Sequence, residues 1–250
     1  SFFNFIDEGH AHHVEKYIFG KKTDKGAYSK ATISRNIVTG YPSTSANSHT
    51  TLMTGAYQGK TGLLYHAWWN LLEKKPEFID SGKMTISMLQ DYNHKFISEN
   101  VKTIFDYYDT SASFHAINRG ATFKLFTPFS IIKSFLPLLF KLKQKSDPNK
   151  PSILAQPQMW KNIFRKYVGR FLERVKDEGM YGASYIVFLL SDENGHAFGF
   201  ESKQYEESVQ LLDHFVKGLV EGIEDKKGNH IAGLKELGYY DDTNWCICTD

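Results

Sequence analysis

The sequence has little cysteine, little net charge and no long hydrophobic run, and each shortage excludes a class of protein. Only two of the 250 residues are cysteine, so the chain is not a scaffold built from disulfides. The formal net charge is +2, which gives no electrostatic argument for binding a nucleic-acid polymer. No apolar run is long enough to cross a membrane, and no signal peptide is recognisable. The hydrophobic fraction of 41% is typical of a globular domain with a large core.

Apolar runs of strand length alternate with amphipathic patterns of helical period along the chain. We predict strands over residues 1–6, 31–40, 102–108, 183–190 and 243–249. We predict helices over residues 11–19, 84–91, 160–177 and 204–223. The alternation predicts an α/β fold, with a doubly wound, mostly parallel sheet and helices on both faces, in a single domain over residues 1–250. Cys246 and Cys248 alternate on the last predicted strand and are expected to be buried thiols.

Residues 41–70 are dense in hydroxyl side chains at a predicted turn from strand to helix. Pro42 ends the preceding strand, a helical pattern begins near Ser48, and Gly55 is suited to end that helix. A hydroxyl group in this turn would lie beside a helix N-terminus, where backbone N–H groups favour an anion such as phosphate. The alternative is that these hydroxyls only form a loop and a helix cap.

Carboxylates follow three of the predicted strands. Asp7 follows the first strand and Asp250 follows the last, while Asp192 and His196 follow the strand over residues 183–190. Gly195 would allow a sharp bend that brings Asp192 and His196 to one point. A carboxylate with an imidazole suits zinc or another divalent ion, and the alternatives are a helix cap or a salt bridge. Because strand ends converge at one crevice of a doubly wound sheet, we expect these groups to share a site with the hydroxyl turn.

The hydroxyl turn resembles the nucleophile segment of the type I phosphodiesterase/nucleotide pyrophosphatase family, in the alkaline phosphatase superfamily. The family pattern is P-x-x-T-x-x-N-H-x-x-(L/I)-x-T-G, followed by a Gly-(Ile/Leu) step. The matching residues here are Pro42, Ser45, His49, Leu52, Thr54, Gly55, Gly62 and Leu63. The segment departs from the family at Ser45, where threonine is usual, and at Ser48, where asparagine is usual.

The resemblance implies an alkaline-phosphatase-like fold and a set of site residues. Catalytic roles fall on Ser45 as nucleophile, with Thr44 as its rival, and on His66 in place of a phosphate-contacting asparagine. The implied metal ligands are Asp7, Ser45, Asp192, His196 and Asp250. They would hold two divalent ions, with zinc favoured and manganese or magnesium as alternatives.

The activity that the resemblance implies is hydrolysis of a small phosphate ester or nucleotide-like substrate through a phosphoseryl or phosphothreonyl intermediate. The alternatives are a phosphomonoesterase or phospho-group transferase of the same superfamily, or a binding protein that has lost turnover. A sulfatase is disfavoured, because Ser45 is followed by Ala46 and Asn47 rather than by the x-Pro-x-Arg of that branch.

Residues 121–157 break the strand–helix alternation, with phenylalanines and leucines set among lysines. For residues 121–157 we favour two short helices packed on the core, and the alternative is a small lid inserted beside the site. Residues 121–145 could also touch a membrane surface. Since the family has metal-binding histidines after the position of Asp250, we expect the C-terminal part of the family domain to lie beyond this chain. A leader could precede residue 1, and the compartment and oligomeric state stay open.

Overall fold

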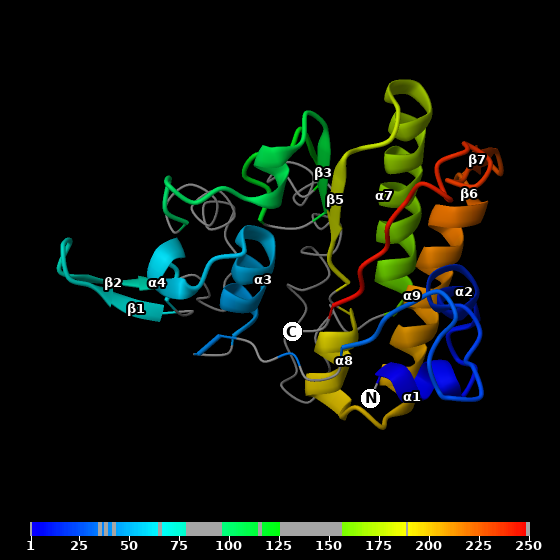
Figure 1. Cartoon of the computed structure of the whole chain (residues 1–250), viewed down its shortest axis with the longest axis horizontal. Coiled ribbons are helices and arrows are strands. Elements are labelled where there is room, and N and C mark those ends of the chain that lie inside the picture. The colour runs from blue at the N-terminus through cyan, green and yellow to red at the C-terminus, as the bar shows by residue number, and fades with distance from the viewer. Residues whose placement is uncertain are drawn as a thin grey trace, which may run out of the picture. The chain divides into compact units, whose positions relative to one another are not determined.

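In the computed structural model of the protein (Figure 1), the chain forms two compact units. The structure describes residues 2–34, 37, 40–41, 44–64, 67–78, 97–114, 117–125, 157–188 and 190–248. Unit 1 comprises Ser1–Arg35, Leu142–Met180 and Phe188–Cys246. Unit 2 comprises Asn36–Lys141, Tyr181–Val187 and Ile247–Asp250. The single domain over residues 1–250 stays a prediction.

Unit 1 is mainly helical. Its elements are α1 (Phe2–Asp7), α2 (His12–Val14), the π-helix η1 (Glu15–Phe19), α7 (Pro157–Glu178), α8 (Leu190–Phe198), α9 (Lys203–Glu221), β6 (Gly222–Glu224) and β7 (His230–Ala232). The long helices α7 and α9 lie side by side (Figure 1), and the rings of Phe164 and Phe215 meet with their centroids 4.8 Å apart. Both helices were predicted from apolar residues recurring at helical spacing, and both predictions are confirmed.

The N-terminal segment of unit 1 is fastened to α9 through one buried carboxylate. Asp213 is 5% exposed, and its Oδ2 lies 2.6 Å from Nδ1 of His13. The backbone N–H of Val14 donates to Oδ1 of the same carboxylate at 2.8 Å. The hydroxyl of Tyr240 donates to the backbone carbonyl of Tyr17 at 2.7 Å, which holds η1 as well.

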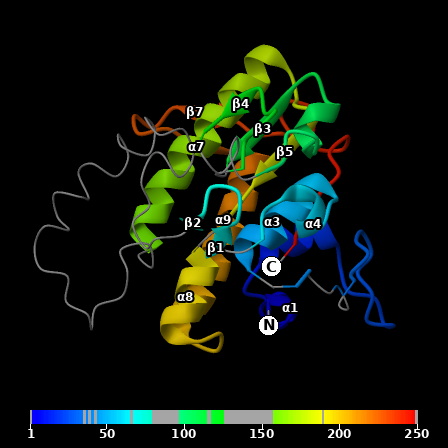
Figure 2. The ribbon, with the colours of Figure 1, turned by 90° about the vertical axis from the view of Figure 1, so that its left-hand side faces the viewer.

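Unit 2 contains the parallel sheet and the predicted hydroxyl turn. Its elements are α3 (Ser45–Thr54), α4 (Gln58–Thr61), β1 (Ala67–Asn70), β2 (Lys75–Phe78), the 3-10 helix η2 (Ile104–Tyr107), β3 (Ser111–Phe114), β4 (Phe123–Lys124) and β5 (Ala183–Ile186). The sheet order is β4-β3-β5, with both pairings parallel (Figure 2), and β1 and β2 form a separate antiparallel pair. A core of Ala46, Met53, Leu63, Ile97, Phe105 and Ile117, among others, packs under α3.

Three predicted strands are wrong. Residues 2–7 form helix α1, which packs through Phe5 on Tyr205 of α9, with ring centroids 5.6 Å apart. Residues 104–107 form η2, because Thr103 and Asp106 make a capping box in which Asp106 Oδ2 accepts the Thr103 N–H at 2.6 Å. Residues 243–248 are irregular, so Cys246 and Cys248 are exposed rather than buried.

Other predictions fall partly outside the described residues. Residues 31–34, 37 and 40 carry no strand, and residues 84–91 lie outside the described part of the chain. Residues 123–124, at the start of the segment predicted to form two short helices or a lid, form strand β4 of the sheet, and residues 126–156 lie outside the described residues.

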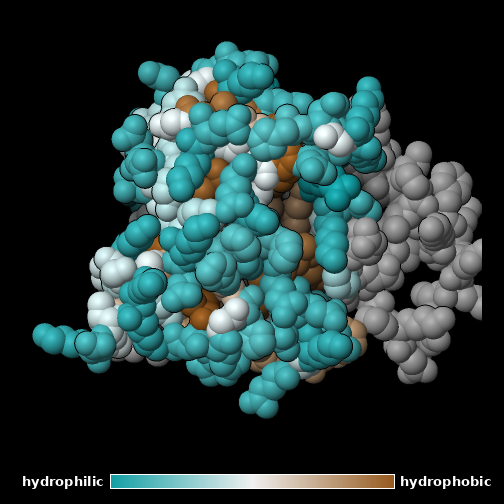
Figure 3. All heavy atoms as spheres, turned by 90° about the vertical axis from the view of Figure 1, so that its right-hand side faces the viewer, coloured by the Kyte–Doolittle hydropathy of each residue, from teal (hydrophilic) through white to brown (hydrophobic). Residues whose placement is uncertain are grey.

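The surface shown in Figure 3 is largely hydrophilic, and hydrophobic residues show there only in small separate areas. Among the described helices, none combines the length and the apolar character that a membrane crossing requires.

Candidate active site

The N-terminus of α3 presents two adjacent hydroxyl residues. Thr44 is the N-cap, with extended backbone angles of φ −137° and ψ 152°, and its carbonyl accepts the N–H of Ser48 at 2.8 Å. The Thr44 hydroxyl oxygen is buried and has no hydrogen-bond partner among the described residues, whereas Ser45 is exposed as the first helical residue. The first N–H groups of an α-helix have no partner within the helix, so this end favours a negatively charged ligand.

Polar side chains fix the rest of α3. Thr50 and Thr54 each donate to the carbonyl four residues earlier, at 2.7 and 2.6 Å. Asn47 is buried and donates to the carbonyl of Leu64 at 2.8 Å, which ties the helix to the segment after α4. Gly55 ends the helix in the left-handed conformation at φ 64°, as predicted. The helix therefore begins three residues earlier than the sequence pattern indicated, with Ser45 at its exposed start.

His49 lies one turn after Ser45 and contacts the sheet. Its Nδ1 lies 2.5 Å from the hydroxyl of Tyr185 on β5, and the two rings meet edge to face. From the sequence, His49 was expected only as a position that matches the family pattern, and no role was predicted for Tyr185. A signal was present, since Tyr185 has a polar hydroxyl and lies in a strand that continues into the apolar residues Ile186 and Val187.

Asp7 is placed differently from its prediction. It is the last residue of helix α1, not the end of a strand. Its two carboxylate oxygens accept hydrogen bonds from Nζ of Lys22 and from the hydroxyl of Tyr28, each at 2.6 Å. Both oxygens are therefore engaged by protein donors.

Asp192 and His196 are brought together, but on a helix. They lie one turn apart on α8, with Oδ1 of Asp192 and Nε2 of His196 separated by 3.4 Å. The predicted sharp bend is wrong, because Gly195 is buried within α8 against the ring of Phe200. Both side chains are exposed, at 52% and 82%, so they are open to a ligand from solution.

The comparison with protein families identifies the chain. The sequence model of the family "Type I phosphodiesterase / nucleotide pyrophosphatase" matches residues 27–232. The chain belongs to this family. The family is part of the alkaline phosphatase superfamily, so the predicted α/β fold with a parallel sheet is confirmed. No curated protein and no solved structure matches the chain significantly.

Members of the family are phosphodiesterase or pyrophosphatase hydrolases, act on small phosphate esters or nucleotides and are typically metal-dependent. The matched region includes Thr44, the whole of α3 with Ser45, and α8 with Asp192 and His196. Asp7 and Asp250 lie outside it, and His66 and Asp250 lie outside the described residues.

The donor set on α8 fits part of a divalent-metal site. Asp192 and His196 supply one carboxylate and one imidazole on the same helix face, which is a combination that binds zinc. Burial, and then the charge of Asp192, raises the pKa of the adjacent Glu193 carboxyl above its ordinary value. Among the described residues there is no group of three or more histidine, cysteine or acidic side chains that could hold a metal ion.

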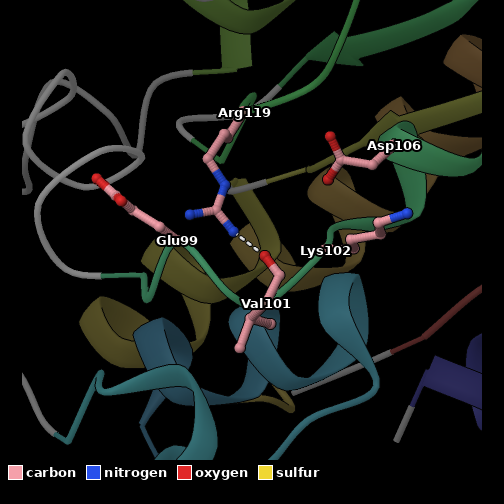
Figure 4. Close-up of a pocket in the computed structure, with 5 residues that line it drawn as sticks. All are labelled: Glu99, Val101, Lys102, Asp106 and Arg119. Carbon is pink, nitrogen blue, oxygen red and sulfur yellow. Dashed lines mark hydrogen bonds between the residues drawn. The ribbon is translucent and has the colours of Figure 1, made fainter.

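An open pocket of about 520 Å³ lies elsewhere in unit 2, lined by Glu99, Val101, Lys102, Asp106 and Arg119 (Figure 4). Two of its charged groups, Arg119 and Asp106, are engaged in structure. The Arg119 guanidinium donates to the carbonyls of Ile97 and Ser98, at 2.8 and 3.2 Å, and to that of Val101, as Figure 4 shows. Asp106 belongs to the capping box at the start of η2. We therefore do not assign this pocket to the substrate.

Proposed function

We propose that the protein is a metal-dependent phosphodiesterase or nucleotide pyrophosphatase that uses Ser45 as its nucleophile. The observation that carries the proposal is the exposed Ser45 at the start of α3, within the region that matches the family. A phosphate oxygen held by the N–H groups of the first helical turn would place phosphorus close to the Ser45 hydroxyl. Thr44 is the weaker candidate because its hydroxyl is buried.

The reaction would proceed in two displacements. The Ser45 oxygen attacks phosphorus while the bond to the leaving oxygen breaks, and water then cleaves the phosphoseryl ester to release phosphate or a monoester. The chain contributes positioning and fixed charge, with Asp192 and His196 proposed as metal ligands. Bound divalent ions would supply charge neutralisation and activation of oxygen nucleophiles.

The remaining assignments follow the family pattern. They give His66 a phosphate contact and make Asp7, Ser45 and Asp250 metal ligands, in a site with two divalent ions for which zinc is favoured. For Asp7, metal binding would require Lys22 and Tyr28 to release its oxygens. The lid at 121–157 and a membrane contact through 121–145 also stay predictions.

The test is turnover of bis-p-nitrophenyl phosphate and p-nitrophenyl phosphate by the protein and by Ser45→Ala and Thr44→Ala, together with the metal content of each. We expect Ser45→Ala to lose at least about 10³-fold in kcat while keeping its fold and most of its metal, because the nucleophile is removed together with only one of the proposed metal ligands. Thr44→Ala, the matched control, should stay within about tenfold. Activity that is retained in Ser45→Ala but lost in Thr44→Ala would identify Thr44, rather than Ser45, as the nucleophile.

The same assay separates the proposal from its alternatives. Faster turnover of the monoester than of the diester would favour the phosphomonoesterase alternative. Absence of turnover and of bound metal would favour a binding protein on this fold.

A further inference from the structure

The hydrogen bond between His49 and Tyr185 connects the helix that carries the candidate nucleophile to the parallel sheet. Nδ1 of His49 and the hydroxyl oxygen of Tyr185 are 2.5 Å apart, and the ring centroids are 6.1 Å apart at an interplanar angle of 71°. Both residues belong to unit 2, as does Ser45. The contact is therefore internal to the unit that contains α3.

The side chain of Tyr185 is restrained by its neighbours in the sheet and the core. Its strand, β5, pairs with β3 so that Tyr185 lies opposite Ser113, whose hydroxyl donates to the carbonyl of Ile117 at 2.9 Å. The Tyr185 ring also packs against the core cluster that includes Ala46 of α3. Because strand pairing and core packing both restrain the ring, its hydroxyl is held in one place.

The hydrogen bond between Tyr185 and His49 therefore restrains the start of α3, where Ser45 lies. His49 and Ser45 are four residues apart on α3, so their side chains share one face of the helix. A hydrogen bond at His49 opposes both rotation of α3 about its axis and sliding along it. The hydrogen bond from Asn47 to the Leu64 carbonyl restrains the buried face of the same helix turn. The two contacts together restrain the first turn of α3, which carries the exposed Ser45.

We propose that His49 and Tyr185 are positioning residues for Ser45, which hold the hydroxyl and the first helical turn in the geometry that phosphoryl transfer requires. This inference rests on the proposed function. Displacement of a reacting atom by about 1 Å costs roughly 10²-fold in rate, so loss of a contact one turn away is enough to slow the chemical step. Substrate affinity depends less on this alignment, and the effect belongs in kcat rather than KM.

Tyr185→Phe is the sharpest variant, because it removes one hydroxyl and keeps the ring that packs on the core. We expect kcat for bis-p-nitrophenyl phosphate to fall about tenfold or more, with KM and metal content within about twofold. His49→Ala should lose about 10²-fold in kcat, and His49→Asn should recover part of that loss because its amide can reach the position of Nδ1. Adding Tyr185→Phe to His49→Ala should have no further effect on kcat, since the proposed role of the Tyr185 hydroxyl depends on its bond to His49.

Tyr107→Phe is the matched control, because Tyr107 lies in the same unit and is 69% exposed. Equal kcat for Tyr185→Phe and Tyr107→Phe would overturn the inference, and so would a lowered Tm of Tyr185→Phe with unchanged kcat. Should His49→Ala fail to fold, Tyr185→Phe still decides the question. Retention of turnover in Ser45→Ala would contradict the proposed function itself. An inactive Ser45→Ala together with normal kcat in Tyr185→Phe would contradict only the positioning role of His49 and Tyr185.

Discussion

Asp213 is the residue on which the attachment of the N-terminal segment most depends. Its buried carboxylate accepts from the Val14 N–H and contacts His13, so removing it leaves a buried backbone donor without an acceptor. We expect Asp213→Ala to lower the free energy of unfolding by about 2–3 kcal/mol and Asp213→Asn by less, since the amide oxygen can still accept from Val14. Urea unfolding measures both, with Glu207→Ala, at an exposed position of α9, as the control.

Glu221 gives a pH dependence whose sign follows from its neighbours. The hydrogen bond from the Tyr17 hydroxyl, and then the charge of Lys16, hold the pKa of Glu221 below its ordinary value of 4.5. A carboxylate with a lowered folded-state pKa stabilises the fold above pH 4.5, and this contribution is lost as pH falls through the lower value. The difference in Tm between the protein and Tyr17→Phe should therefore be full above pH 5 and shrink toward pH 3.

A Tm difference between these two proteins that does not change over this pH range would show that the Tyr17–Glu221 bond is not coupled to the ionisation of Glu221. Tyr57→Phe, at a tyrosine that is 71% exposed, controls for loss of a phenol elsewhere.

The left-handed conformation of Gly55, which ends helix α3, can be tested by substitution. Gly55 has φ 64°, and a Cβ added there would meet nothing within 4 Å, so Gly55→Ala is opposed by the backbone alone. We expect a loss of about 1–2 kcal/mol in the free energy of unfolding. Gly59 of α4 also has open space around an added Cβ but is not among the positive-φ residues, so Gly59→Ala should be neutral or stabilise by up to about 1 kcal/mol. Equal effects would contradict the conformational explanation.

The elements that could be predicted from the sequence are those in which the pattern of apolar residues extends over many residues. Helices α7 and α9 span 22 and 19 residues, and their apolar residues recur often enough to exclude a strand. The apolar run before Asp7 is too short for that distinction, and its packing on α9 decides for a helix. The capping box of Thr103 and Asp106 was readable in the sequence, but the apolar residues around it suggested a strand.

Like the helices and strands, the candidate site could be predicted only in part from the sequence. The four-residue spacing of Asp192 and His196 correctly indicated proximity, although a helix rather than a turn provides it. The start of α3 at Ser45 was expected near Ser48, since its first residues carry no apolar periodicity. The contacts of Asp7 with Lys22 and Tyr28 could not be predicted, because they depend on how distant segments fold together.

For the molecule as a whole, membership in a typically metal-dependent family makes removal of metal the decisive treatment. After dialysis against a chelator, we expect turnover of bis-p-nitrophenyl phosphate to fall at least about 10²-fold and to return with Zn²⁺, Mn²⁺ or Mg²⁺. Elemental analysis before and after dialysis, with far-UV circular dichroism as a control for folding, makes the result interpretable. Full turnover in a sample shown to be free of metal would exclude the metal dependence of the proposed function.

The contact of Val14 with Asp213 also has a consequence for the order in which unit 1 folds. The two residues are 199 positions apart, so the acceptor for the Val14 N–H leaves the ribosome long after the donor. The first segment of unit 1 must therefore remain without its contacts to α9 while α7, the whole of α8 and more than half of α9 are synthesised. A chain with such distant contacts folds slowly, because loop closure precedes any gain from packing. During that interval Phe5 of α1 lacks its contact with Tyr205, and we expect synthesis of this protein in a cell to depend on chaperones that bind short apolar segments.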